Sequence, residues 1–280
     1  MQRVVVVTDS TATLPEDLVQ ELNIRVVPVL LLFGQQGYRD GVDIHPKEVY
    51  RLLRSGSRIP TSAAPSVGDF LRAYAGAGPE VTGILSVHMS PKLSTTFNVA
   101  IMAGELVDGV TVRVFNCQTA AMGQGFVVLA AARAAARGAS LDDVLRRAEE
   151  MASKVNMFFT LDTFEYLHRG GRIGGAAALV GSLLQIRPVL YLADGHVGVF
   201  CKPRTKRRAL RIILQQIEAE ARAGPLHAAV LHADTPDEAE ELRNTIAQRF
   251  DCAELHVTEF TPVMGAHTGP GLVGVAFYSE

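Results

Sequence analysis

The spacing of apolar and polar positions divides the chain into two parts that meet near residue 155. In the first part, short apolar runs alternate with amphipathic stretches whose apolar residues recur at helical spacing. The run 4–7 is continuously apolar, which is typical of a strand buried on both faces. The predicted strands are 4–7, 25–33, 82–87 and 110–116, and the predicted helices are 13–22, 45–54, one from 66, one from 90, one ending near 137 and one from 140. This alternation predicts a mostly parallel sheet.

Several helix starts are marked by side chains that can cap a first turn. These pairs are Thr13 with Glu16, Ser66 with Asp69 and Ser140 with Asp143. Ser90 before Pro91 predicts another start, with Ser90 as N-cap and the proline in the first turn. Pro28 lacks a backbone N–H, so the strand 25–33 is expected at an edge or with a bulge. Residues 37–43 are predicted to form a loop.

The second part has a different pattern. Two strand-like runs, 187–193 and 196–202, flank Asp194-Gly195, which is a strong hairpin signal. Further strands are predicted at 156–161, 227–233, 253–260 and 271–279, and helices at 205–221 and 236–250. We therefore expect an α/β protein of two domains. Residues 1–155 would form an N-terminal domain around the mostly parallel sheet, and residues 156–280 a C-terminal α+β domain with an antiparallel sheet.

Composition narrows the class of protein. A chain of 280 residues is long enough for a large core and near the length at which chains divide into domains. A net charge of -2 gives no sign of nucleic-acid binding. No apolar run approaches the roughly 20 residues that span a bilayer, and the run at the N-terminus is short enough for a strand rather than a signal peptide. The three widely spaced cysteines suggest free thiols in a reducing cytoplasm.

Three clusters of hydroxyl side chains follow strands or open helices. They are Thr8/Ser10/Thr11, Thr61/Ser62 and Ser94/Thr95/Thr96. The carboxyl ends of parallel strands are where such sheets bind ligands. Free N–H groups at a helix start, together with hydroxyl donors, suit a small anionic group such as a carboxylate. A single cluster is more often a helix cap or a packing feature, but the three together favour a binding site.

Three further segments carry candidate chemistry. His267 and Thr268 lie in "MGAHTGPGLVG", where glycines allow close approach of the backbone and a histidine can donate to an anion or exchange protons. The second segment is basic: Arg169 and Arg172 flank two glycines in "LHRGGRIGG". Another basic stretch, "CKPRTKRR", includes Lys202 and Arg204 ahead of a helix. Both stretches suit a phosphate or an acidic partner, while Arg207 and Arg208 are better explained as a solvated helix face.

Enzymatic function is the main alternative from the residues alone. Ser94 or Ser62 could act as a nucleophile with His267 in a hydrolase or transferase, with Asp9 as the carboxylate that orients the histidine. No GxSxG, HExxH, P-loop or dinucleotide motif supports this. A transcriptional or interaction protein is a third alternative, although the sequence has no DNA-binding motif.

Several stretches resemble the DegV family, the fatty-acid-binding proteins that serve bacterial fatty-acid kinases. The similar stretches, in order along the chain, are "VTDSTATLP", "VVPVLLLFG" with "YRDGVDI", "PTSAAPS", "LSTTFNVA", "LHRGGRIGG", "KPRTKRRAL" and "HTGPGLVGVAF". The chain differs from the family where Thr95 replaces the usual glycine of LSGT and where "TSAAPS" is one residue longer than the usual TSQPS.

The resemblance implies a carrier without catalytic activity or cofactor. One long-chain fatty acid would lie in an apolar tunnel between the two domains, partly lined by the Gly- and Leu-rich stretch 174–192. Its carboxylate would be held by Thr61, Ser94 and His267, together with the neighbouring Ser62, Thr95 and Thr268. A partner kinase would phosphorylate the carboxylate, giving an acyl phosphate for phospholipid synthesis. Arg169, Arg172, Lys202 and Arg204 would meet the phosphate or the kinase. The implied location is the cytoplasm, with at most transient peripheral contact with a membrane and no nucleic-acid partner.

Overall fold

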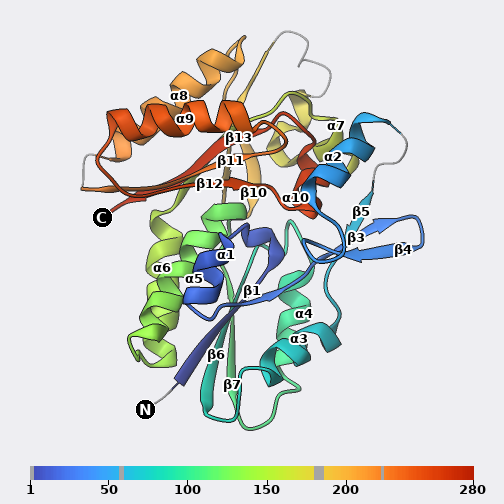
Figure 1. The fold of residues 1–280 in the computed structure, drawn as a ribbon, viewed down its shortest axis with the longest axis vertical. Helices are drawn as coiled ribbons and strands as arrows, with labels where there is room; N and C mark the ends of the chain where they lie inside the picture. Colours follow the sequence, from blue (N-terminus) through green and yellow to red (C-terminus); the bar gives the residue numbers. More distant parts are fainter. Residues whose placement is uncertain (1–2, 57–59, 180–185, 222–223) are drawn as a thin grey trace.

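The computed structural model describes residues 3–56, 60–179, 186–221 and 224–280. It is an α/β structure with two main sheets, one in each half of the chain (Figure 1). The first sheet has the order β2-β1-β6-β7, and every pair in it is parallel. Its strands are β1 (Arg3–Asp9), β2 (Arg25–Val27), β6 (Val81–His88) and β7 (Thr111–Asn116). The predicted parallel sheet is confirmed.

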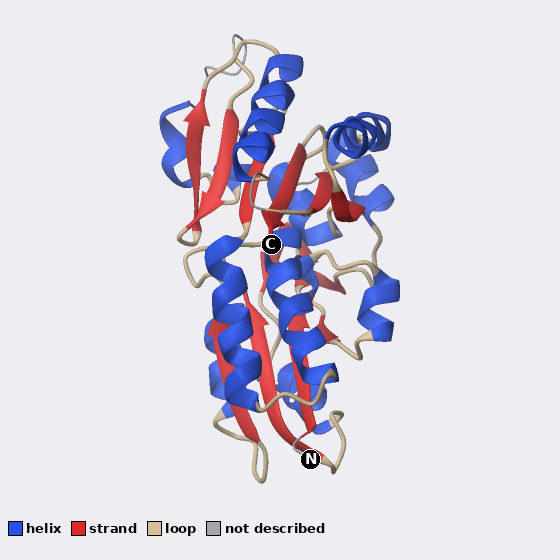
Figure 2. Cartoon of the chain, turned by 90° about the vertical axis from the view of Figure 1, so that its left-hand side faces the viewer, coloured by secondary structure: helices blue, strands red, loops and turns tan. Residues whose placement is uncertain are grey.

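Helices cover both faces of this parallel sheet. One face carries α3 (Val67–Ala75) and α4 (Thr96–Gly104), and the other carries α5 (Ala121–Ala136) and α6 (Leu141–Lys154) (Figures 1 and 2). The central strands are buried on both sides, which explains the continuous apolar run of β1. The short elements η1 (Ser10–Ala12) and α1 (Glu16–Glu21) link β1 to the edge strand β2.

The second sheet has six strands in the order β10-β9-β8-β13-β11-β12. Its strands are β8 (Asn156–Thr160), β9 (Val189–Ala193), β10 (His196–Cys201), β11 (Leu226–His232), β12 (Cys252–Glu259) and β13 (Val273–Ser279). The pairs are antiparallel, as predicted, except for β11 with β12. That pair is parallel because α9 (Pro236–Arg249) crosses over between the two strands. Helix α8 (Lys206–Glu220) lies beside α9 on the outer face of the sheet (Figure 1).

A small antiparallel sheet, β4-β3-β5, was not predicted. Its strands are β3 (Leu30–Phe33), β4 (Gln36–Arg39) and β5 (Thr61–Ala63), and α2 (Pro46–Arg54) is inserted between the last two. The prediction of one strand over 25–33 is wrong because the chain leaves the parallel sheet at Pro28, and the predicted loop 37–43 contains part of β4. We call these four elements the arm, and Figure 1 shows it projecting to one side of the parallel sheet.

Two of the predicted helix starts are also wrong. Thr13 adopts a left-handed backbone with φ of 51°, so α1 begins only at Glu16 and has no side-chain cap. Ser90 and Pro91 open a separate turn, in which Leu93 N donates to Ser90 O at 2.8 Å, and α4 begins at Thr96. The caps at Ser66 and Ser140 are present, each accepting from the backbone N–H three residues later.

One apolar core runs through both halves of the chain. It joins Val87 of the parallel sheet to Phe159 of the six-stranded sheet. At this junction the rings of Phe126 and Tyr278 pack edge to face with centroids 5.2 Å apart. A second core lies between the six-stranded sheet and helices α8 and α9. The division into domains at residue 155 stays a prediction, since the two halves share a core.

Candidate functional site

A cavity lies where the carboxyl ends of the parallel strands face the six-stranded sheet. Thr11, Val29, Met89 and Ala120 follow the four parallel strands in turn, and all four line it. About 720 Å³ of space free of atoms lies within the cavity and its open mouth. In the order β2-β1-β6-β7, the strand that follows β1 in sequence lies on one side of it, and the later strands β6 and β7 lie on the other side. Ligands of α/β sheets usually bind at such a switch point, here between β1 and β6.

The opposite wall is apolar because of strand alternation. Met157 and Phe159 point from β8 into the cavity, while Phe158 between them packs on Phe277 in the other core. The remaining apolar lining comprises Leu93, Leu167, Leu192, Val197, Phe260, Val263, Met264 and Leu272. Of the stretch 174–192 that was expected to line a tunnel, Leu192 does so, and residues 180–185 lie outside the described residues. The walls suit an apolar ligand.

One end of the cavity is polar. Ser62 from the arm and His267 from α10 (Pro262–Thr268) share a hydrogen bond of 2.7 Å between Oγ and Nε2. Burial, with a smaller contribution from the charge of Arg172, lowers the pKa of His267 to about 4. The imidazole is therefore neutral at pH 7, and the Ser62–His267 pair can offer an O–H or N–H donor to an anion.

Arg172 holds the polar end together. It follows α7 (Glu165–Arg169) and donates from Nε to Leu93 O at 2.9 Å and from a terminal nitrogen to Gly170 O at 2.6 Å. These bonds tie the loop after β6 to the loop after α7. Five N–H groups belong to a guanidinium, so donors remain for a ligand. Beside this link, Ser94 lines the cavity and shares a hydrogen bond of 2.8 Å with Thr96.

A recess adjoins the polar end on its outer side. Ser62, Arg172 and His267 line both the cavity and the recess, so these three side chains separate the two spaces. The other residues of the recess are Pro60, Thr61, Tyr166, Arg169, Gly170 and Ala266. Thr61 and Arg169 are exposed, and Arg169 pairs with Glu165 at 3.0 Å. A group held by the three shared residues would lie close to this recess.

The structure brings together most of the residues singled out in the sequence. Ser62, Ser94, His267 and Thr268 line the cavity, Thr61 and Arg169 line the recess, and Arg172 lines both. Thr268 donates its hydroxyl to Met264 O at 3.0 Å. Thr95 is exposed and is the N-cap of α4. Lys202 and Arg204 are exposed between β10 and α8. These last three residues belong to neither the cavity lining nor the recess lining found among the described residues.

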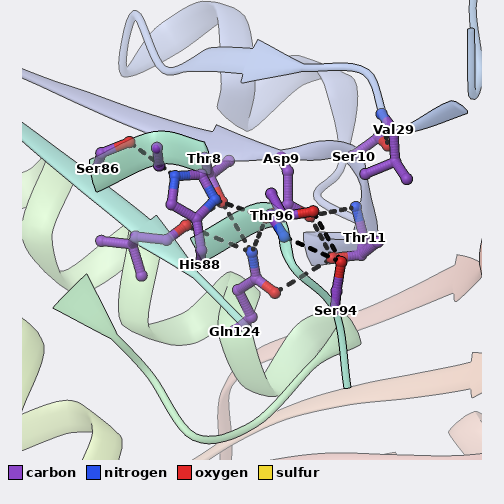
Figure 3. A network of polar contacts seen from close by, with 12 residues as sticks. Thr8, Asp9, Ser10, Thr11, Val29, Ser86, His88, Ser94, Thr96 and Gln124 are labelled. Atoms are coloured by element: carbon purple, nitrogen blue, oxygen red, sulfur yellow. Dashed lines mark hydrogen bonds and ion pairs between the residues drawn. The ribbon is translucent and has the colours of Figure 1, made fainter. Parts of the chain in front are cut away.

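The first hydroxyl cluster belongs to a buried polar network (Figure 3). His88 Nδ1 donates to Asp9 at 2.7 Å, and His88 Nε2 shares a bond of 2.7 Å with Ser86. Gln124 of α5 donates to Thr8 and to Asp9. Burial alone would raise the pKa of Asp9, but the hydrogen bond and charge of His88 outweigh it and lower the pKa. The network fixes the ends of β1 and β6 beneath the cavity.

This network corrects the expectation that Asp9 orients His267. Asp9 is hydrogen-bonded to His88 instead. Ser86, His88 and Asp9 resemble a catalytic triad in their order, but all three are fully buried, so a substrate cannot reach them. Sequence reasoning missed His88 and Gln124. The available signal was a polar residue at the end of one apolar strand and another inside an apolar helix.

Comparisons with known proteins agree with this geometry. The model of a family described as an uncharacterised protein, DegV family, matches residues 3–280. A DegV domain-containing protein of Streptomyces coelicolor is 38% identical over 284 residues, covering 100% of this chain and 99% of the relative. A solved structure described as fatty acid binding of a DegV family protein from Thermus thermophilus is 37% identical, with a TM-score of 0.94 over 100% of both chains. The structure of DegV, a fatty acid binding protein from Bacillus subtilis, is 30% identical, with a TM-score of 0.91 over 100% of both chains.

Among the described residues, no helix is long and apolar enough to cross a membrane. In the same part of the chain, no group of three or more His, Cys, Asp or Glu side chains is arranged to hold a metal ion.

Proposed function

Because this chain belongs to the DegV family, we propose that it binds one long-chain fatty acid in the cavity between its two main sheets. The observation that carries the proposal is a largely apolar cavity with Ser62, Arg172 and His267 gathered at one place in its wall. The related proteins from Thermus thermophilus and Bacillus subtilis are described as binding fatty acids. An acyl chain would fill the apolar part, and its carboxylate would meet the polar end.

The two parts of the ligand would contribute differently. A tail with about fourteen methylenes gains roughly 11 kcal/mol, before costs, at ~0.8 kcal/mol for each buried CH₂. Each hydrogen bond to a charged group adds about 1.5–3 kcal/mol. The tail therefore supplies most of the affinity, while the head group fixes the register of the ligand and keeps the carboxylate at the recess.

We assign the head-group site to Ser62, Ser94, Arg172 and His267. The neutral imidazole can donate its Nε2–H to Ser62, which leaves the Ser62 O–H to donate to a carboxylate, and the guanidinium beside the ring supplies the positive charge. Thr268 lines the same end, although its hydroxyl proton is used within α10. Thr61 lies on the recess side, where it would meet the outer oxygen of the head group.

We further propose that the protein presents this carboxylate to a fatty-acid kinase. The kinase would transfer a phosphoryl group to a carboxylate oxygen, giving an acyl phosphate for phospholipid synthesis. The recess beside the head-group site supports this, since it would give a partner access without opening the apolar cavity. Arg169 at the recess, with Lys202 and Arg204 elsewhere on the surface, would meet the kinase or the phosphate. Such a carrier would work in the cytoplasm and contact a membrane only in passing.

A hydrolase or transferase is the second candidate, and the 2.7 Å contact between Ser62 and His267 favours it. A serine beside a histidine is the core of many acyl-transfer sites. However, a side chain on Gly170 would overlap Nδ1 of His267, so this nitrogen faces backbone where such enzymes place a carboxylate. We therefore prefer the carrier.

Mass spectrometry of the organic extract of the purified, denatured protein tests the proposal. We expect close to one long-chain fatty acid per chain, and the delipidated protein should take up added fatty acid again. An empty extract with no uptake would refute the proposal. Hydrolysis of an acyl ester by the parent protein, abolished in Ser62→Ala, would support the enzyme instead.

A further inference from the structure

Helix α10, which carries His267, has an unusual N-terminus. Thr261 occupies its N-cap but makes no side-chain bond to the helix, and Pro262 has no N–H to offer. The first backbone N–H of the helix is therefore that of Val263. It donates to Oδ1 of Asp40 at 2.8 Å, across 223 residues of sequence. Asp40 thus performs the role that a local capping residue usually has.

Asp40 is held firmly in the arm. The residue is 2% exposed, and its backbone N donates to Val29 O at 2.9 Å. Burial raises the pKa of the Asp40 carboxyl group, and the hydrogen bond from the Val263 N–H opposes that rise. Loss of Asp40 would leave the Val263 N–H buried without its partner.

The arm contacts α10 at two further points along its length. In the middle, a side chain on Gly265 would lie 2.6 Å from the hydroxyl of Tyr50, so the helix backbone rests on that ring. At the end, His267 is bonded to Ser62 of β5. A helix of seven residues is too short to hold its shape alone, so these contacts set its position.

We propose that Asp40 is a positioning residue of the head-group site. By capping α10 from the arm, it holds His267 Nε2 against Ser62 at the other end of the helix. The inference rests on the proposed function only in taking His267 as part of the carboxylate site. Asp40 itself lies outside the cavity and recess linings found among the described residues.

The test compares Asp40→Ala with Asp40→Asn, which keeps a side-chain oxygen to accept from Val263. Asp43→Ala is the matched control, because Asp43 lies on the same arm but forms an exposed pair with Arg39. The readouts are the ¹⁵N signals of the His267 ring, amide exchange at Val263, and the release rate of a bound ¹³C-labelled fatty acid.

We expect Asp40→Ala to shift the His267 signals, speed amide exchange at Val263 and release the fatty acid roughly tenfold faster, as loss of about one hydrogen bond would. Asp40→Asn should restore most of each value, and Asp43→Ala should match the parent. If Asp40→Ala does not fold, Val263→Pro removes the donor of the same bond and should give the same shift of the His267 ring signals, which is the readout used for that variant.

Folded Asp40→Ala or Val263→Pro protein with parent-like His267 signals would overturn the inference. So would an Asp40→Asn variant as impaired as Asp40→Ala, or an Asp43→Ala variant with the same losses. The ring and amide measurements need no ligand. If the parent binds no fatty acid, the proposed function fails while Asp40 is still tested.

Discussion

The imidazole of His267 lies directly against the backbone of Gly170, with no room for a side chain between them. One face of the polar end is therefore backbone, and Ser62 occupies the other side of the ring.

Replacing Gly170 with alanine should displace His267. The added Cβ would overlap Nδ1, and overpacking of this kind costs about 1–3 kcal/mol. We expect weaker fatty-acid retention, measured by mass spectrometry, and a lower melting temperature. Gly68→Ala is the control, because a Cβ there would make only contacts of 3.6 Å. Unchanged retention in Gly170→Ala would show that the position of His267 is not critical.

Removing single head-group donors should weaken binding modestly. Ser94→Ala and His267→Ala should each cost about 1.5–3 kcal/mol of binding free energy, measured by calorimetry on delipidated protein. Ser62→Ala combined with His267→Ala should cost less than the sum of the two single changes, since the residues share one bond. Thr95→Ala should have no effect, because Thr95 is exposed outside the cavity lining. Parent-like affinity in every variant would place the carboxylate elsewhere.

The buried histidine should make stability depend on pH. The pKa of His267 falls from 6.5 to about 4 on folding, so below pH 6.5 the unfolded chain binds the proton first. The contribution of His267 to the free energy of unfolding is therefore fully present above pH 6.5 and is lost as the pH falls toward 4, by up to about 3 kcal/mol. Urea unfolding at several pH values should show this decline, and His267→Gln should flatten it. Bound fatty acid should also reduce the decline, because a carboxylate beside the ring raises its pKa. An unchanged pH profile in His267→Gln would contradict the assignment.

The basic residues should separate lipid binding from phosphotransfer. Arg169→Ala and Arg204→Ala should keep the fatty acid but lose acyl-phosphate formation with a cognate kinase, because both side chains are exposed. Arg172→Ala should lose both activities, since its guanidinium is bonded to two loops of the cavity. Arg207→Ala is the control and should match the parent. Loss of lipid in Arg169→Ala or Arg204→Ala would mean that these residues support the pocket rather than a partner.

Local sequence signals predicted those parts of the fold that depend on neighbouring residues. The alternation of strands and helices predicted the parallel sheet, and Asp194-Gly195 predicted the β9–β10 hairpin, where both residues have positive φ. The start of α4 was misplaced because Ser90 and Pro91 suit a turn as well as a helix cap. Residue type alone does not distinguish these two outcomes.

Contacts between distant residues were beyond such signals. The hydroxyl and histidine motifs indicated a site, yet the pairing of Ser62 with His267 spans 205 residues. The cap from Asp40 to Val263 is longer still, and the arm that provides it forms a sheet of short strands with a weak apolar pattern. Arg172 was expected to meet a partner, whereas its bonds to Leu93 and Gly170 place it in the cavity wall.

The apolar core that runs through both halves of the chain has a thermodynamic consequence for a carrier. Its cargo would complete the same core that holds the fold together, so occupancy and unfolding become linked equilibria. A ligand present at 100 times its dissociation constant adds about 2.7 kcal/mol to the free energy of unfolding. The melting temperature of the protein would then report how much of it is loaded, and each delivery of lipid would leave behind a less stable molecule until the next is taken up.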